Sequence, residues 1–371
     1  MAGLYIHIPF CASRCIYCGF YSTTRHSMRR KYIETLCREI AMRHDYLHEP
    51  IHTIYIGGGT PSLLDEEQLT LLFTNIDYTA ATEITIECNP DDITPQYASM
   101  INRLPINRVS MGAQTFNDSR LRFIRRRHSS NDIELAVKLL RDAGTANISI
   151  DLMYSFPGET MDEWQNDIDH ALALGVEHLS AYSLMFEENT PLHLMLTEGR
   201  IKETEEELSA AMYYALIDRL TSAGYEHYEI SNFALSGYRS QHNSSYWNAT
   251  PYMGIGAAAH SFDITSRQWN VPDIDSYMAA VSRGELPMEH EELDMDTRYN
   301  DTVMLRLRTC EGINLNALAD DFGNKYRNAC LNSARRYIDD GMLKHTDDGR
   351  LRLTRRGLFV SDMIMSDMMM V

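Results

Sequence analysis

Residues 4–18 read LYIHIPFCASRCIYC, a short apolar and β-branched run that leads directly into three closely spaced cysteines. Such a run is typical of a buried strand. Five further runs have the same character along the first two-thirds of the chain. They are TIYIGGG (53–59), EITIECNP (83–90), RVSMGAQ (108–114), ISIDLMYSFP (148–157) and HLSAYSLMF (178–186). The sequence therefore predicts six strands, with the cysteines at the C-terminal end of the first.

Each predicted strand is followed by a segment of helical length and pattern. These segments span 29–47, 65–76, 94–104, 131–144, 161–175 and 205–225. Helices between strands imply parallel βαβ units with right-handed crossovers. Six such units predict an α/β fold, either an open doubly wound sheet or a partial (β/α)6 barrel of the TIM type. In both folds the chemistry lies at the C-terminal ends of the strands.

The last third of the chain follows a different pattern. Residues 236–290 are irregular, whereas two helical segments at 315–323 and 326–341 precede a hairpin pattern at 342–354 with Asp-Gly in its turn. Helix, helix and hairpin predict a winged-helix-like α+β module. We therefore predict three regions: a barrel at 1–235, an irregular extension at 236–290, and a C-terminal module at 291–371.

Composition and charge exclude several classes of protein. Of 371 residues, 44% are hydrophobic and 23% charged, which excludes a disordered or fibrous chain. The net charge of -18 argues against general nucleic-acid binding, and residues 291–371 hold 12 Lys and Arg against 14 Asp and Glu. No apolar stretch is long enough for a transmembrane helix, and MAGLYIHIPFC does not resemble a signal peptide. We therefore expect a cytoplasmic protein.

The cysteine pattern is the most distinctive feature. Seven cysteines in a chain without an export signal argue against a disulfide framework. Cys11, Cys15 and Cys18 form Cys-x3-Cys-x2-Cys, and thiolates at this density favour zinc or an iron–sulfur cluster. Structural zinc usually needs a second pair of ligands, which the isolated remaining cysteines do not supply. Three thiolates suit a [4Fe–4S] cubane whose fourth iron stays open to a small molecule.

This cysteine spacing after the first strand, followed by GGGTP (57–61) after the second, resembles the radical S-adenosylmethionine (SAM) superfamily. The longer string YIHIPFCASRCIYCGF (5–20) resembles the branch that contains the oxygen-independent coproporphyrinogen III dehydrogenases (HemN) and the heme chaperones (HemW). The resemblance extends over nearly the whole chain. It implies that Cys11, Cys15 and Cys18 bind a [4Fe–4S] cluster and that the open iron chelates SAM.

The resemblance also implies a set of SAM contacts. They are Tyr5, Tyr17, Gly58, Gly59, Thr60, Glu87, Gln114, Arg126 and Asp151. Glycine allows close approach of the backbone, and a glutamate can accept hydrogen bonds from ribose hydroxyls or an ammonium group. In HemN the positions that match Gln114, Arg126 and Asp151 serve a second SAM molecule. Tyr5 as an ordinary strand residue and Arg126 as one of a solvated basic run remain alternatives.

Three features favour the chaperone over the dehydrogenase. HemN has a fourth cysteine where this chain has Phe20, and it has an extended segment ahead of its cluster, whereas the first cysteine here is residue 11. HNSSYW (242–247) matches the HNxxYW signature of HemW. We therefore expect His242 to ligate heme iron and Tyr246 and Trp247 to contact the porphyrin. The alternatives are that His242 is a satisfied loop histidine and that His260 is a further candidate.

The expected function is that of a heme chaperone with a [4Fe–4S] cluster, SAM and heme as cofactors. Its expected partners are an acceptor hemoprotein and an electron donor such as flavodoxin or ferredoxin. An alternative is a radical SAM enzyme that acts on a tetrapyrrole, either a coproporphyrinogen III dehydrogenase or a heme-modifying methyltransferase. A DNA-binding redox regulator is a third possibility that the acidic charge disfavours.

Overall fold

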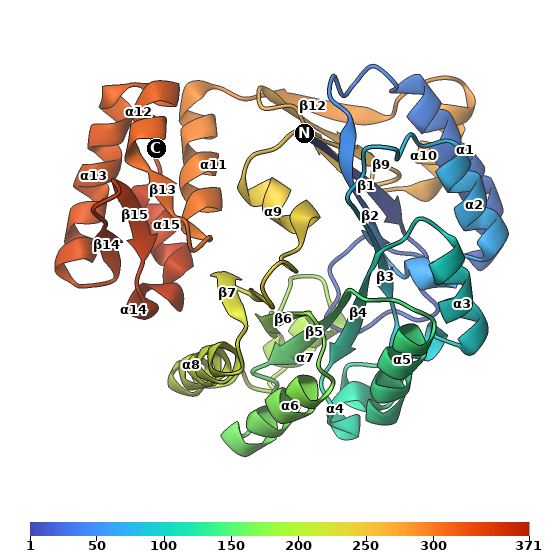
Figure 1. The fold of residues 1–371 in the computed structure, drawn as a ribbon, viewed down its shortest axis with the longest axis horizontal. Coiled ribbons are helices and arrows are strands. Elements are labelled where there is room, and N and C mark those ends of the chain that lie inside the picture. The colour runs from blue at the N-terminus through green and yellow to red at the C-terminus, as the bar shows by residue number, and fades with distance from the viewer. Residues whose placement is uncertain (371) are drawn as a thin grey trace.

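The computed structural model describes residues 1–370 and contains one curved sheet whose centre is six parallel strands. These strands run in chain order, and each agrees with a predicted one. They are β1 (Ala2–Ile8), β2 (Ile51–Gly58), β3 (Glu83–Cys88), β4 (Arg108–Gln114), β5 (Ile148–Tyr154) and β6 (His178–Ser183). The sheet curves without closing and its crossover helices lie on one side, so of the two architectures that the sequence allows this is the partial (β/α)6 barrel (Figure 1).

Helices cover the convex side of this sheet (Figure 1). The six predicted helices are α1 (Arg29–Met42), α2 (Glu66–Thr74), α3 (Pro95–Arg103), α5 (Ser130–Asp142), α6 (Met161–Ala173) and α8 (Glu206–Ser222). Capping boxes begin α2 at Asp65 and α6 at Thr160. Two short helices were not predicted: α4 (Asp118–Phe123) and α7 (Pro191–Thr197).

The stretch 236–290, predicted to be irregular, contains regular structure instead. It holds α9 (Gln241–Trp247), β9 (Tyr252–Ile255), β10 (His260–Phe262), β11 (Ser266–Asn270), α10 (Ile274–Ser282) and the start of β12 (Met288–Glu292). Strand β9 pairs in parallel with β1, and β10 to β12 continue the sheet beyond it. These strands have three to five residues each, too short for a clear periodic pattern. At the opposite edge, β8 (Asn232–Ala234) and β7 (Glu226–Glu229) pair antiparallel after β6.

The C-terminal module has its own hydrophobic core. Its elements are α11 (Met295–Leu307), β13 (Ile313–Asn314), α12 (Leu315–Phe322), α13 (Asn324–Asp339), β14 (Leu343–His345), β15 (Arg350–Leu353), α14 (Arg355–Leu358) and α15 (Ser361–Met368). Helices α12 and α13 followed by the β14–β15 hairpin form the winged-helix-like arrangement that the sequence predicts, and β13 adds a third strand beside β15. Ion pairs such as Arg355–Asp218 and Arg239–Glu311 attach the module to the barrel.

Helix α9 lies between the two parts, on the concave side of the barrel sheet and next to α11 (Figure 1). It contacts β1 and β2 on one side and α11 on the other. The HNSSYW motif is therefore placed between the barrel interior and the C-terminal module.

Candidate functional site

The cysteine loop follows β1 and is held at two points. The Thr23 N–H donates to the Pro9 carbonyl at 2.7 Å, which closes the loop at its base. Ile16, between the second and third cysteines, is buried; its N–H donates to the Ile124 carbonyl, and its carbonyl accepts from the Leu192 N–H. Helices α4 and α7, which these two contacts involve, thus fix a loop that has no regular structure of its own.

A cavity of about 200 Å³ opens beside this loop at the C-terminal ends of the parallel strands. Its lining includes eleven of the predicted site residues. They are Cys11, Cys15, Tyr17, Cys18, Gly58, Gly59, Thr60, Glu87, Gln114, Arg126 and Asp151. They come from the cysteine loop, from β2 to β5 and from the segment after α4. The structure thus brings together residues that are up to 140 positions apart, at the sheet edge where parallel folds bind ligands.

The three thiols share this cavity but differ in their neighbours. The Thr60 hydroxyl lies 3.6 Å from the Cys11 sulfur, and the Arg126 guanidinium lies 3.8 Å from the Cys15 sulfur. Burial raises the pKa of Cys11 and of Cys18, so metal binding at these thiols must displace protons.

The two metal sites that the sequence allows, a single zinc ion and a [4Fe–4S] cluster, require different spacings of the thiols. Among residues 1–370, no three Cys, His, Asp or Glu side chains converge as closely as one metal ion requires. In a cubane each thiolate binds a different iron, so its ligands need only surround a common space. Three thiols around one cavity fit that requirement.

The GGGTP turn packs directly on the base of the cysteine loop. The Gly59 N–H donates to the Ile8 carbonyl at 2.8 Å, and a Cβ on Gly59 would lie 2.8 Å from Pro9 backbone carbon. Gly58 has φ +112°, and a Cβ there would lie 2.5 Å from the His7 ring. Only glycine fits these positions, and the exposed backbone forms one wall of the cavity.

Two carboxylates line the cavity from the strands on either side of β4. Glu87, at the end of β3, accepts hydrogen bonds from the Tyr55 hydroxyl at 2.8 Å and from the Gly58 N–H at 3.0 Å. Burial raises the pKa of Glu87 to about 7 and also raises the pKa of Asp151 on β5. Burial removes the hydration that would stabilise the charged carboxylates. A cationic or hydroxyl-bearing ligand would supply hydrogen bonds in its place.

Gln114 and Arg126 are positioned by an irregularity at the end of β4. The strand register shifts between Gly112 and Gln114, and Gln114 has φ +69°. Such a bulge redirects the side chain that follows it. Arg126 donates to the Gly112 carbonyl at 2.5 Å and to Asn89 Oδ1 at 2.9 Å. It is therefore held at the cavity wall and is not part of a solvated basic run.

Asn89 was not singled out from the sequence, although it lines the cavity and orients Arg126. It directly follows Glu87–Cys88 in the strand-end motif ECNP. Its position at the end of a parallel strand was the available signal.

Tyr5 and His260 do not line this cavity. The Tyr5 ring stacks on that of Tyr55, with ring centres 6.3 Å apart, and its hydroxyl is hydrogen-bonded to His7 at 3.0 Å. His260 is exposed on β10 at the far side of β9 and stacks on Trp269. His260 thus lies away from the cysteine cavity. Tyr5 lies behind the cavity wall, against the Tyr55 ring that donates to Glu87, and its role as a SAM contact stays a prediction.

His242 is fully buried, and both of its ring nitrogens have partners. Nδ1 is hydrogen-bonded to the Thr53 hydroxyl at 2.8 Å and Nε2 to the Tyr246 hydroxyl at 2.8 Å. Burial lowers the pKa of His242 to about 3, so the ring is neutral. Both nitrogens are occupied, as in the satisfied-histidine alternative, so direct ligation of an iron would require one of these bonds to break.

A continuous set of contacts links His242 to the cysteine cavity. The His242 ring stacks on Tyr55 with ring centres 5.2 Å apart. Tyr55 donates to Glu87, and Glu87 accepts from the Gly58 N–H. On its other side His242 holds Tyr246, which lines a second and larger cavity together with Trp247.

Comparisons with known proteins agree with this geometry. The radical SAM superfamily model matches residues 5–171, and the HemN C-terminal domain model matches residues 293–360. The heme chaperone HemW of Lactococcus lactis is 36% identical over 87% of this chain and 84% of its own length. The heme chaperone HemW of Bacillus subtilis is 32% identical over 96% of both chains. The chain belongs to the HemW branch of the radical SAM superfamily.

The fold of this branch extends over both parts of the chain. The solved structure of coproporphyrinogen III oxidase (HemN) from Escherichia coli has a TM-score of 0.84 and covers 99% of this chain and 89% of its own, at 21% sequence identity. The barrel and the C-terminal module of this chain thus share one architecture with that protein. None of the helices formed by residues 1–370 has both the length and the apolar character that membrane crossing requires.

Proposed function

We propose that this chain is a heme chaperone that binds a [4Fe–4S] cluster, SAM and heme, and that transfers heme to an acceptor hemoprotein. The observation that carries the proposal is the similarity, over nearly the whole chain, to several proteins named heme chaperone HemW. The cavity with three cysteines at the end of the parallel strands supports the cluster and SAM parts of the proposal.

The residues of the cysteine cavity then have distinct roles. Cys11, Cys15 and Cys18 would hold three irons of the cluster. The glycine backbone of the GGGTP turn and the Glu87 carboxylate would bind the amino and ribose groups of SAM, and Arg126 would hold a carboxylate. When bound and reduced, the cluster would supply the electron that cleaves a sulfonium C–S bond of SAM.

Phe20 supports a chaperone rather than a coproporphyrinogen dehydrogenase. It lines the cysteine cavity two residues after Cys18, and 71% of its surface is exposed. HemN has a further cysteine at this position, and phenylalanine offers neither a ligand nor a proton donor. The side-chain chemistry next to the proposed cluster therefore differs from that of HemN.

The contacts between the two cavities support a gating role for the cluster and SAM. Glu87 lies at the proposed SAM site, and Tyr246 lies at the second cavity, with Tyr55 and His242 packed between them. A ligand that changes the charge or position of Glu87 would change the environment of Tyr246. We infer that an electron donor such as flavodoxin or ferredoxin acts through these contacts between the two cavities. Its action would promote release of heme to the acceptor.

The test is an anaerobic assay of the reconstituted protein with reductant and SAM. We expect heme to bind with about one equivalent per chain, and coproporphyrinogen III to remain unchanged. A coproporphyrinogen dehydrogenase would instead form protoporphyrinogen IX together with stoichiometric 5′-deoxyadenosine. Decarboxylation without heme binding would contradict the chaperone proposal.

A further inference from the structure

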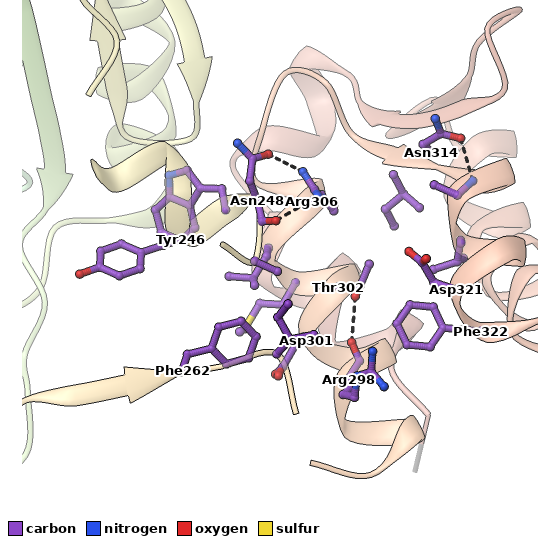
Figure 2. A pocket seen from close by; sticks show the side chains of 18 of the residues that line it. Tyr246, Asn248, Phe262, Arg298, Asp301, Thr302, Arg306, Asn314, Asp321 and Phe322 are labelled. Atoms are coloured by element: carbon purple, nitrogen blue, oxygen red, sulfur yellow. Dashed lines mark hydrogen bonds between the residues drawn. The ribbon is translucent and has the colours of Figure 1, made fainter. Parts of the chain in front are cut away.

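A cavity of about 680 Å³ separates the barrel from the C-terminal module (Figure 2). One wall comes from α9 and strands β9 to β11, and the other comes from α11, β13 and α12. Its volume lies in the range of roughly 300–1,000 Å³ that is usual for small-molecule sites. It shares no lining residue with the cysteine cavity, so it is a separate site.

Aromatic rings form much of its surface. Tyr246, Trp247 and Phe262 lie on the barrel side, and Phe322 lies across the cavity on α12. Flat aromatic and aliphatic surfaces on two sides of a gap suit a broad planar ligand, because stacking and burial both act over its faces. These walls favour a macrocycle over a compact polar metabolite.

Two arginines of α11 line the cavity. Arg298 and Arg306 lie eight residues apart on α11, about 12 Å along the helix axis. Within residues 1–370, neither has a carboxylate partner, although the chain carries an excess of 18 negative charges. Arg306 donates instead to the side chain and carbonyl of Asn248. Burial, and to a smaller extent the nearby charge of Arg350, lowers the pKa of Arg306, so a ligand anion would stabilise its charged form.

The two carboxylates of the cavity offset this charge only in part, although the charge of Asp321 acts on Arg306. Asp301 is already paired with Arg267, and Asp321 is exposed. Two arginines without carboxylate partners beside an aromatic wall therefore match a ligand that is planar and apolar with an anionic edge.

We propose that this cavity is the heme site, with the macrocycle between the aromatic walls and the two propionates bound by Arg298 and Arg306. This inference rests on the proposed function and names its binding site. Met304, which lies between the two arginines on α11 and is 37% exposed, supplies a thioether of the kind that ligates heme iron. His242 is then a positioning residue that orients Tyr246, and it is not an iron ligand.

The first test changes the two arginines of the cavity and, separately, removes the charge of the heme propionates. Arg298→Gln and Arg306→Gln should each weaken heme binding by roughly tenfold or more in an absorbance titration of the cluster-loaded protein. Heme dimethyl ester, which lacks both negative charges, should bind weakly to the wild type and equally weakly to both variants. Arg38→Gln is the matched control, because Arg38 is exposed on α1 outside the cavity.

The second test fills the cavity without changing its charge. Ala317 is exposed and lines the cavity on α12, whereas its neighbour Asn316 is exposed but does not line it. Ala317→Trp should weaken heme binding at least tenfold and leave the cluster absorbance unchanged, whereas Asn316→Trp should bind heme like the wild type. If the wild type binds heme and neither the arginine variants nor Ala317→Trp weaken it, the site assignment is wrong and the chaperone proposal stands. If the wild type binds no heme, the proposed function itself fails.

Discussion

At the scale of single residues, the three loop cysteines differ from the other four by their surroundings. Cys37, Cys88 and Cys330 are buried in the hydrophobic cores, and Cys310 lies at the surface beside Arg239. Changing Cys11, Cys15 or Cys18 to Ala should abolish the visible absorbance of the reconstituted cluster. The same change at the other four should leave iron and sulfide content unaltered. Full iron content in a loop variant would overturn the ligand assignment.

The histidine of the HNSSYW motif allows a distinction between ligation and positioning. His242→Ala should weaken heme binding by roughly 2- to 10-fold, the contribution of one neutral hydrogen bond, because Tyr246 loses its partner. Tyr246→Phe, a milder change, should have an effect of similar size. In both variants the absorption and EPR spectra of bound heme should match those of the wild type. A change of spin state in His242→Ala alone would identify His242 as an iron ligand.

Glu87 should make stability depend on pH in a defined window. Its pKa is about 7 in the folded protein and 4.5 when unperturbed, because burial disfavours the charged form. Between pH 4.5 and pH 7, Glu87 is ionised in the unfolded chain but still protonated in the folded chain. A rise in pH through this range therefore favours the unfolded state. Measured without SAM, the free energy of unfolding of the wild type minus that of Glu87→Gln should fall from pH 4.5 to 7. The slope should reach at most roughly 1.4 kcal/mol per pH unit, and the difference should be constant above pH 7. A flat difference throughout would contradict the burial of this carboxyl.

At the scale of elements, the contact between the GGGTP turn and the cysteine loop should not tolerate a methyl group. A Cβ on Gly59 would lie 2.8–2.9 Å from the backbone of residues 8–10, whereas a Cβ on Gly19 would lie 3.6 Å from its nearest neighbour. Gly59→Ala should cost about 1–3 kcal/mol of stability and lower the cluster content after reconstitution. Gly19→Ala, in the same loop, should behave like the wild type. Equal cluster content in both variants would show that the contact is not needed.

The elements that the sequence predicts well are those with a long periodic pattern. The six βα units were predicted because each helix has nine or more residues with regular apolar spacing, and Gly144 and Gly175 follow α5 and α6 with positive φ. Strands β9 to β11 were not predicted, because three to five residues are too few for a clear periodic pattern and β9 pairs with the distant β1.

The same limit applies to the site residues. Many of the residues that line the cysteine cavity stand in motifs at the ends of predicted strands, so each could be identified as a candidate site residue from the sequence. The burial of His242 depends on Thr53, which is 189 positions away, and could not be predicted from its own motif.

At the scale of the whole molecule, the two cavities occupy different interfaces. The cysteine cavity belongs to the barrel alone, whereas the larger cavity exists only because the C-terminal module packs against α9. The residues that give the larger cavity its charge, Arg298 and Arg306, come from a module whose net charge at the sequence level is slightly acidic. Composition therefore did not indicate a binding site there, and only the packing of the module brings these arginines to the HNSSYW motif.

The heme chaperone proposal is tested most directly by measuring anaerobic transfer of heme from the loaded protein. Heme-loaded protein with a reduced cluster and SAM would be mixed with an apo-hemoprotein, and in parallel with a passive heme scavenger. We predict that intact heme reaches the acceptor faster than it reaches the scavenger, and that omission of SAM or reductant slows this transfer. Equal rates to acceptor and scavenger that do not depend on SAM, or recovery of a chemically altered macrocycle, would contradict it.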